Sequence, residues 1–274
     1  PLDEIPDLEI LENDLEDALV HARRGWHKFV LENKEWKHVI QAYLASISFA
    51  DAQVGRLLDA LEESGKADET IVVLWSDHGM HIGEKENWEK FTLWEEATRV
   101  PFFVKAPGVT KPGSVVSQAV SLLDLYPTLV DLAGFEIPDH CDGASVVPLL
   151  EDPNAEREHS ALTSFTYPGN KTGHALRGNR YRYIYYEWNS LEELYDHDSD
   201  PNEFTNLAYD PTLAGVIEQF RNEMVSRVSR VSVDEMLERP SGYTVSNGRV
   251  SVDGFIPMAQ VPLPKERPKK ESIR

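Results

Sequence analysis

An aspartate and a histidine, Asp77 and His78, stand side by side just after the apolar, β-branched run 71–75. In an open α/β sheet, ligands collect at the carboxyl ends of strands, where this pair would lie. A carboxylate oxygen suits a hard divalent cation such as calcium, whereas an imidazole is a less usual calcium ligand. The pair is a candidate metal site in which Asp77 is the firmer ligand, and a structural or capping role is the alternative.

Further cationic and polar side chains could hold an anion near that metal. Lys90 closes the tripeptide W-E-K after Asp77, and a preorganised ammonium group would stabilise charge developing on bound oxygens. His81 could line the same cleft. His174 and Arg177 are candidate substrate contacts if a C-terminal subdomain supplies one wall of the pocket. The alternative for each is an ordinary solvated or surface side chain.

The ordered motifs of residues 71–108 resemble the sulfatase branch of the alkaline-phosphatase-like hydrolases, most closely its iduronate-2-sulfatase-like members. These motifs are SDHG, I-G-E, W-x-K, ATRVP and APG, and the resemblance extends over roughly residues 36–210 through SLLDLYPTLVDLAG and ELYDHDSDPNEFTNLA. It implies a calcium-dependent sulfuric ester hydrolase that acts on a sulfated carbohydrate or another small organic sulfate. By this resemblance Asp77 and His78 contact the metal, and Lys90 contacts the sulfate.

The family's nucleophile has no counterpart in this sequence. It is a formylglycine made from the Cys or Ser of a C-x-P-x-R or S-x-P-x-R motif, and further metal ligands come from an adjacent Asp pair. The single cysteine, Cys141, lies in D-H-C-D-G, which fits neither motif. We therefore expect the C-terminal part of a sulfatase, which needs the missing N-terminal half of the same enzyme as its partner and is inactive by itself.

Two alternatives stay open for the function. Metal-and-lysine sites also suit phosphoryl oxygens, so a phosphoester or phosphonate hydrolase of the same superfamily is the rival enzyme class. The other alternative is a non-catalytic fragment that acts as a scaffold or interaction module. The upstream motif would distinguish the enzymes, because Cys or Ser with x-P-x-R favours a sulfatase, while a threonine nucleophile without it favours phosphate chemistry.

Composition limits the classes of partner. The 274 residues carry a net charge of −20, which argues against nucleic acid and anionic membrane surfaces because phosphate contacts need clustered Lys and Arg. No apolar run approaches the roughly eighteen residues of a membrane-spanning helix. One cysteine excludes an internal disulfide but does not fix the compartment. The resemblance implies a periplasmic, secreted or lysosomal enzyme.

The hydrophobic pattern predicts the elements that must position these residues. Apolar residues at helical spacing predict a helix over 36–61 with Gly65 as its C-cap, followed by a buried strand over 70–75. A strand over 101–106 and a helix over 124–132 continue this α/β part. If part of the parent sheet comes from another half, the first strand keeps an unpaired edge or an exposed apolar face.

A polar, proline-containing break near 151–154 predicts a second unit. Alternating apolar and aromatic residues at 160–167, 174–186 and 193–195 predict an antiparallel sheet, and a helix is expected over 212–229. The fold class is therefore α/β, the C-terminal part of an alkaline-phosphatase-like sulfatase domain plus a small α+β subdomain with an antiparallel sheet. The predicted division is an acidic linker and entry segment (1–35), the α/β part (36–152), the α+β subdomain (153–230) and a tail of unclear structure (231–274).

Four residues near the end of that sheet resemble a metal cluster in composition: Asp196, His197, Asp198 and Asp200. In the family this segment is a structural strand and turn. We expect the same role here.

Overall fold

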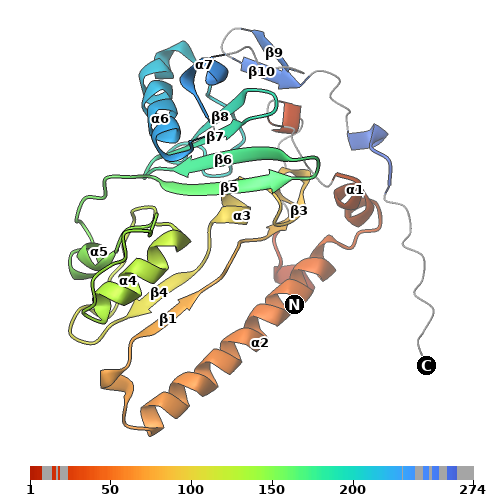
Figure 1. Cartoon of the computed structure of the whole chain (residues 1–274). Coiled ribbons are helices and arrows are strands. Elements are labelled where there is room, and N and C mark those ends of the chain that lie inside the picture. Colours follow the sequence, from red (N-terminus) through yellow and green to blue (C-terminus); the bar gives the residue numbers. More distant parts are fainter. Residues whose placement is uncertain are drawn as a thin grey trace.

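The computed structural model describes residues 1–7, 14–16, 18, 24–229, 231–237, 243–246, 249–252 and 258–263. The elements form two groups along the chain (Figure 1). The first group contains helices α1 (Arg24–Glu32), α2 (Trp36–Glu63), α3 (Glu95–Thr98), α4 (Leu125–Leu132) and α5 (Val147–Glu151), with strands β1 (Val72–Trp75), β2 (His81–Ile82), β3 (Trp88–Glu89) and β4 (Phe102–Lys105). The second contains strands β5 (Ala161–Tyr167), β6 (Lys171–Arg177), β7 (Tyr181–Tyr186), β8 (Leu191–Asp196), β9 (Tyr243–Ser246) and β10 (Arg249–Val252), with helices α6 (Ala214–Arg227) and α7 (Val233–Met236).

The long helix α2 confirms the prediction made from its apolar spacing. It runs two residues past the predicted end, and Gly65 follows with a φ of +69°, a left-handed conformation that glycine adopts without steric cost. Much of its apolar surface is uncovered, since Leu44, Phe49 and Leu57 are 49%, 69% and 71% exposed. Only part of the apolar face therefore packs against the described residues.

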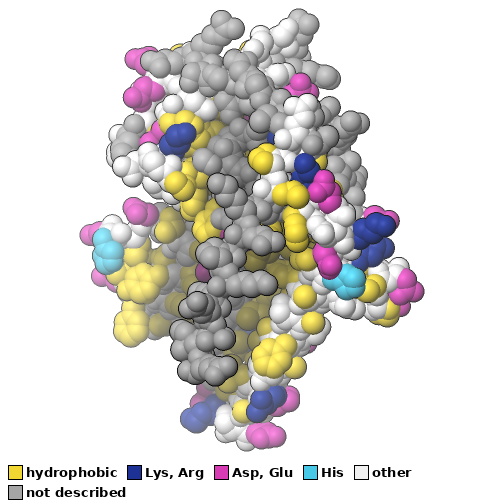
Figure 2. Space-filling view, turned by 90° about the vertical axis from the view of Figure 1, so that its right-hand side faces the viewer, with side chains coloured by type: hydrophobic (Ala, Val, Ile, Leu, Met, Phe, Trp, Pro, Cys, Tyr) yellow, Lys and Arg dark blue, Asp and Glu magenta, His cyan; other side chains and the backbone are white. Residues whose placement is uncertain are grey.

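The strand β1 is paired on one side only. It runs antiparallel to β4, with Trp75 opposite Phe102, and Leu74, Trp75 and Phe103 are 41%, 47% and 64% exposed. The prediction of a buried strand is wrong, because no third described strand pairs with it and no described layer covers these side chains. The prediction of an exposed apolar face is confirmed. Hydrophobic side chains also gather over the lower half of the view in Figure 2.

The sheet β5-β6-β7-β8 is an antiparallel meander, as predicted. Successive side chains of a strand point to opposite faces, and both faces are filled here. Ile184 and Tyr186 pack in a cluster with Trp94, while Tyr183 packs on the other face in a cluster with Met224 of α6. The sheet is thus built on the segment that leads into α3. The limits predicted for a separate subdomain, 153–230, stay a prediction.

The predicted tail, 231–274, holds two described elements. These are α7, which begins with a capping box between Ser232 and Glu235, and the β9–β10 hairpin. Residues 238–242, 247–248, 253–257 and 264–274 of the tail lie outside the described residues. None of the helices in the described part of the chain combines the length and apolar character needed to span a bilayer.

Candidate active site

The loop after β1 is held against the short helix α3. The Gly79 amide donates to the Ala97 carbonyl at 2.9 Å, and the Ser76 amide donates to the Pro101 carbonyl at 3.3 Å. A Cβ atom at Gly79 would stand 1.9 Å from the Glu96 carbonyl oxygen. Glycine is therefore required at this position, because its backbone approaches α3 more closely than any side chain permits.

Two predicted site residues, Lys90 and Asp77, lie close to an imidazole atom of a third, His78. Nζ of Lys90 lies 2.6 Å from Nε2 of His78, and Oδ1 of Asp77 lies 3.6 Å from the same atom. Nδ1 of His78 lies 2.7 Å from the Gly79 carbonyl oxygen. Since a carbonyl only accepts, Nδ1 carries the proton and Nε2 presents its lone pair. The structure therefore brings Asp77, His78 and Lys90 together.

This donor set fits part of a divalent-cation site. Asp77 offers carboxylate oxygens on a side chain that is 80% exposed, and His78 offers the lone pair of Nε2. Orientation of a ligating imidazole by a hydrogen bond from its other nitrogen is a usual feature of metal sites. Two ligands fall short of the six to eight that calcium prefers. Further ligands are needed to complete a calcium site.

A cavity of about 1960 Å³ extends from these residues to the antiparallel sheet. Its lining includes Asp77, His78 and Lys90, and also Arg177 of strand β6. Arg177 donates to the Asn179 carbonyl at 3.1 Å, and its Nε lies 3.4 Å from the Glu95 carboxylate. Burial lowers the pKa of Arg177, and the charge of Glu95 opposes that shift. The predicted substrate contact at Arg177 is thus placed on the cavity wall.

His81 lies behind the cavity wall rather than in it. Its side chain is fully buried, and its Nε2 atom lies 2.7 Å from the hydroxyl of Thr92, which does line the cavity. Burial lowers the pKa of His81 to about 4, so the ring is neutral near pH 7. The substrate contact predicted for His81 stays a prediction, and the position of the ring lends it no support.

His174 is also buried, in the middle of the sheet. Its Nδ1 lies 2.8 Å from the Ser164 hydroxyl, and its Nε2 lies 2.7 Å from the Glu187 carboxylate. The side chain is 2% exposed. Ser164 borders the cavity, whereas His174 is not among the lining residues. The structure does not bring His174 to the cluster around Lys90, and its proposed contact with substrate stays a prediction.

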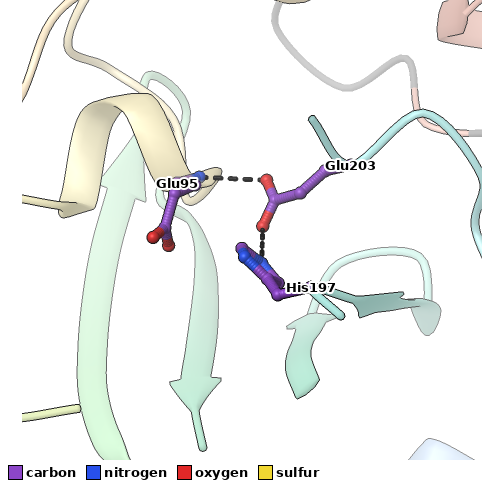
Figure 3. A group of neighbouring side chains, drawn as sticks. All are labelled: Glu95, His197 and Glu203. Carbon is purple, nitrogen blue, oxygen red and sulfur yellow. Dashed lines mark hydrogen bonds and ion pairs between the residues drawn. The ribbon is translucent and has the colours of Figure 1, made fainter. Parts of the chain in front are cut away.

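The grouping of Glu95, His197 and Glu203 was not predicted from the sequence (Figure 3). Their potential ligand atoms all lie within 4.8 Å of one another, but Arg182 already supplies a cation there. It donates to Oε1 of Glu203 at 2.6 Å and to the Glu95 carboxylate. The group is therefore a buried ion-pair network. Only the D-P-N-E sequence that ends at Glu203 could have drawn attention to it.

The acidic segment that precedes Glu203 is structural, as expected. Asp196 ends β8 and accepts two hydrogen bonds from Arg180, at 2.7 and 2.6 Å. Asp200 accepts from the Thr205 amide at 2.8 Å. These carboxylates are used to close the turn after β8.

Two family models match the chain. A model described as sulfatase matches residues 12–135, and one described as N-sulphoglucosamine sulphohydrolase, C-terminal, matches residues 83–230. A sulfatase of Formosa agariphila is 40% identical over 207 residues, which are 76% of this chain and 38% of that protein. An N-acetylglucosamine-6-O-sulfatase of Bacteroides thetaiotaomicron is 33% identical over 183 residues, 63% of this chain and 33% of that protein. The chain thus spans well under half the length of these relatives.

Solved structures of sulfatases also resemble this chain. A 2-O GAG sulfatase superposes with a TM-score of 0.73 at 27% identity, over 91% of this chain and 58% of that one. A complex with the substrate D-glucosamine-2-N,6-O-disulfate gives 0.68 at 28% identity, over 76% and 44% of the two chains. A phosphonate monoester hydrolase of Silicibacter pomeroyi gives 0.57 at 28% identity, over 74% and 42%.

The matches bear on the predicted fold and on the predicted family. The neighbours carry the alkaline-phosphatase-like fold, so the predicted fold class is confirmed. The matches do not single out the iduronate-2-sulfatase-like members, and that closer assignment stays a prediction. Because a family model covers more than half of the sequence and several relatives are sulfatases, this chain belongs to the sulfatase family.

Proposed function

We propose that this chain is the C-terminal part of a sulfuric ester hydrolase that acts on a sulfated carbohydrate or another small organic sulfate. The observation that carries the proposal is the convergence of Asp77 and Lys90 on Nε2 of His78, at 3.6 and 2.6 Å. An ammonium group beside two potential metal ligands is suited to a tetrahedral anion with several oxygens. Sulfated-sugar names among the relatives support the same class of substrate.

Each residue has a distinct role in this proposal. Asp77 and His78 would hold calcium, and the Gly79 carbonyl keeps the lone pair of Nε2 turned toward the site. When bound, the metal supplies Lewis-acid polarisation and a formylglycine supplies the nucleophile. Lys90 binds the sulfate oxygens and stabilises the charge that develops on them. Arg177, which lines the same cavity, contacts the rest of the substrate.

The site needs a second polypeptide segment, and we propose that it is equivalent to the N-terminal part of the relatives. The described residues contribute two metal ligands, and the chain spans 38% of the Formosa agariphila sulfatase. The apolar side chains left uncovered on α2, β1 and β4 offer a large face for that segment. Contiguous apolar patches of this kind mark interaction surfaces. The missing ligands and the nucleophile would arrive with it.

Phosphate or phosphonate ester hydrolysis is the second candidate function. The observation that favours it is the likeness to the phosphonate monoester hydrolase of Silicibacter pomeroyi. A metal and a lysine would serve phosphoryl oxygens equally well. The sulfatase names of the curated relatives are the reason to rank this candidate second.

The test is to assay the chain with calcium on an aryl sulfate and an aryl phosphate, alone and joined to an N-terminal sulfatase segment with its formylglycine. We expect the chain alone to be inactive and the assembled protein to hydrolyse the sulfate. Hydrogen exchange across α2 and β1 should slow on assembly if the apolar face is the contact. Phosphatase activity without sulfatase activity would select the second candidate, and turnover by the isolated chain would contradict the proposed division of the site.

A further inference from the structure

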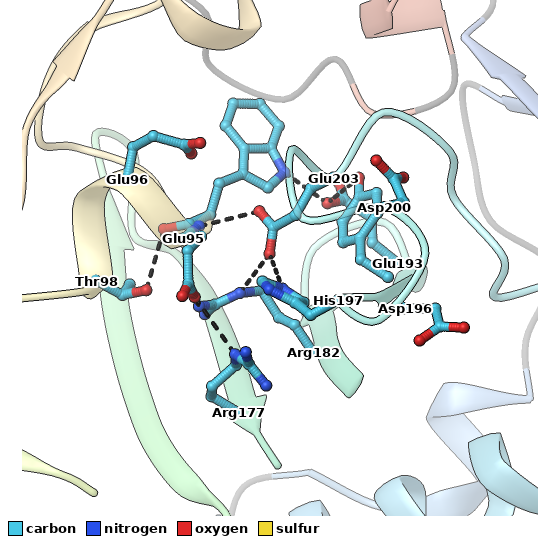
Figure 4. Close-up of polar contacts among 12 residues, drawn as sticks. Glu95, Glu96, Thr98, Arg177, Arg182, Glu193, Asp196, His197, Asp200 and Glu203 are labelled. Atoms are coloured by element: carbon cyan, nitrogen blue, oxygen red, sulfur yellow. Dashed lines mark hydrogen bonds and ion pairs between the residues drawn. The ribbon is translucent and has the colours of Figure 1, made fainter. Parts of the chain in front are cut away.

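We propose that Glu203 is a positioning residue for the loop that carries Asp77 and His78, and that it acts through the helix α3. The inference rests on the proposed function, because it assigns a remote carboxylate to the metal-binding end of the same site. It depends on a continuous series of contacts from the turn after β8 to the loop after β1, and Figure 4 shows the part of this series at Glu203 and Glu95. No metal or ligand takes part in that series.

The first contact joins Glu203 to the start of α3. Oε2 of Glu203 accepts a hydrogen bond from the backbone amide of Glu95 at 2.9 Å, across 108 residues of sequence. Glu95 is the first residue of α3, so this amide is one of the helix N-terminal donors that has no partner within the helix. A carboxylate at that position also interacts favourably with the helix dipole. Glu203 therefore fixes where α3 begins.

Glu203 itself is held firmly. It is fully buried, and its other oxygen, Oε1, lies 2.6 Å from Nε of Arg182 and 2.9 Å from Nε2 of His197. Burial by itself would raise the pKa of Glu203, but the neighbouring Arg182, together with the other donors, lowers it to about 2. The group is ionised throughout the physiological range. A buried carboxylate with partners on both oxygens has little freedom to move.

The second contact joins α3 to the metal-ligand loop. The Gly79 amide donates to the Ala97 carbonyl, which belongs to α3, at 2.9 Å. The backbone at Gly79 leaves no room for a side chain against Glu96. His78 precedes Gly79 directly and bonds to its carbonyl at 2.7 Å. A shift of α3 must therefore move the loop and turn the imidazole.

The helix α3 is too short to hold its place by itself. It contains four residues and closes a single turn through the bond from the Arg99 amide to the Glu95 carbonyl at 2.7 Å. Isolated helices of this length are unstable. Its position must come from neighbours, and the Glu203 carboxylate is the described group that reaches its first amide. The turn after β8 thus sets the geometry of the loop.

The test uses two variants of Glu95, because replacing Glu203 strips buried Arg182 of its partner and risks unfolding the chain. Glu95→Pro replaces the amide hydrogen that Glu203 accepts with a ring carbon, so it removes this bond and pushes the Glu203 carboxylate away from the start of α3. Proline suits the first position of a helix, and Trp94 before it is extended with ψ of 166°, as the residue before proline prefers. Glu95→Ala keeps the amide and is the matched control. Both variants lose the same carboxylate.

The first measurement is amide hydrogen exchange at Gly79, by NMR on the chain itself. We expect exchange at Gly79 to be roughly tenfold faster or more in Glu95→Pro than in Glu95→Ala, since the lost bond is made to a charged group. Protection across β6 and β7 should be equal in the two variants, which shows that both fold. Equal exchange at Gly79 would overturn the inference.

The second measurement is turnover of an aryl sulfate by the assembled protein with calcium. Glu95→Pro should show a lower kcat and a higher calcium concentration for half-maximal rate than Glu95→Ala, with KM for the sulfate unchanged. A purely stabilising contact would leave these quantities equal once both proteins are folded, and that result would overturn the positioning role. If the unsubstituted protein has no sulfatase activity, the proposed function fails, and the exchange rate at Gly79 still decides whether Glu203 positions the loop.

Discussion

The ammonium nitrogen of Lys90 lies 2.6 Å from Nε2 of His78. The two residues come from different loops, which follow strands β1 and β3. Their contact shows that the lone pair of His78 faces the same space as the positive charge of Lys90. A cation held by His78 and an anion held by Lys90 would therefore lie next to each other, so the pair defines the centre of the candidate site.

Replacing Lys90 should slow turnover without changing the fold. In the assembled protein we expect Lys90→Ala to lower kcat on an aryl sulfate about a hundredfold, or ~3 kcal/mol, because the developing charge loses a preorganised cation. Steady-state kinetics measure the loss. Lys66→Ala, a change of an exposed lysine, is the control and should leave kcat unaltered. Unchanged kinetics in Lys90→Ala would make Lys90 a solvated surface charge.

Asp77 should matter for metal binding and not for folding. Its side chain is 80% exposed, so Asp77→Ala removes a ligand without opening a cavity. Calorimetric titration of the assembled protein with calcium should show markedly weaker calcium binding in Asp77→Ala. The control Asp139→Ala, a change of an exposed aspartate, should bind calcium as tightly as the parent protein. The isolated chain should bind calcium weakly, because its described residues supply only part of the coordination sphere. Equal affinity in the variant and the parent protein would remove Asp77 from the site.

Local patterns predicted much of the fold but not the surroundings of the site. The helix α2 follows from apolar spacing, and the meander β5–β8 follows from alternation and turn residues, since both signals lie within short windows. The burial of His81 could not be predicted, because it depends on Trp94 and Thr92 packing around the ring. Strand β1 was expected to be buried because its residues are apolar, but burial requires a covering layer.

The contacts of Glu203 also could not be predicted from local sequence patterns. Apart from the D-P-N-E sequence that it ends, nothing within its own segment distinguishes this glutamate from a solvated surface acid. Its partners, Arg182 and the Glu95 amide, lie 21 and 108 residues away. A carboxylate in such a place is recognisable only when tertiary structure brings those donors to it. The metal-ligand pair, by contrast, was found because its motif is contiguous.

Gly79 and Gly55 should respond in opposite ways to the same change. A Cβ atom at Gly79 would stand 1.9 Å from a backbone oxygen, so Gly79→Ala should lower the free energy of unfolding by on the order of 3 kcal/mol. Nothing lies within 4 Å of a Cβ atom at Gly55, inside α2. Gly55→Ala should raise the free energy of unfolding by about 1 kcal/mol through helix propensity. Urea denaturation of both variants tests this, and an unchanged free energy of unfolding in Gly79→Ala would mean that the approach of Gly79 to α3 is not tight.

A buried carboxyl group beside His81 should make stability depend on pH. Nδ1 of His81 lies 4.0 Å from Oε2 of Glu96. Burial and the nearby Glu203 raise the pKa of Glu96 to about 8, whereas burial lowers that of His81 to about 4. The neutral Glu96 carboxyl therefore contributes to the free energy of unfolding at low pH. This contribution is lost as the pH rises through the folded-state pKa of about 8. The neutral His81 ring contributes fully to the free energy of unfolding above pH 6.5, which is its pKa in the unfolded chain. This contribution is lost only as the pH falls toward the folded-state pKa of about 4.

Of these two groups, therefore, only Glu96 should change the stability between pH 6.5 and 8. We expect the free energy of unfolding to fall across this interval by up to roughly 2 kcal/mol, since each pKa unit corresponds to about 1.4 kcal/mol. Glu96→Gln cannot ionise and should flatten this dependence, while Glu156→Gln, which changes an exposed carboxyl group, should retain it. Urea titrations at the two pH values provide the measurement. An equal fall in Glu96→Gln would show that the Glu96 carboxyl is already ionised in the folded chain at neutral pH, and the neutral pair with His81 would then have to be abandoned.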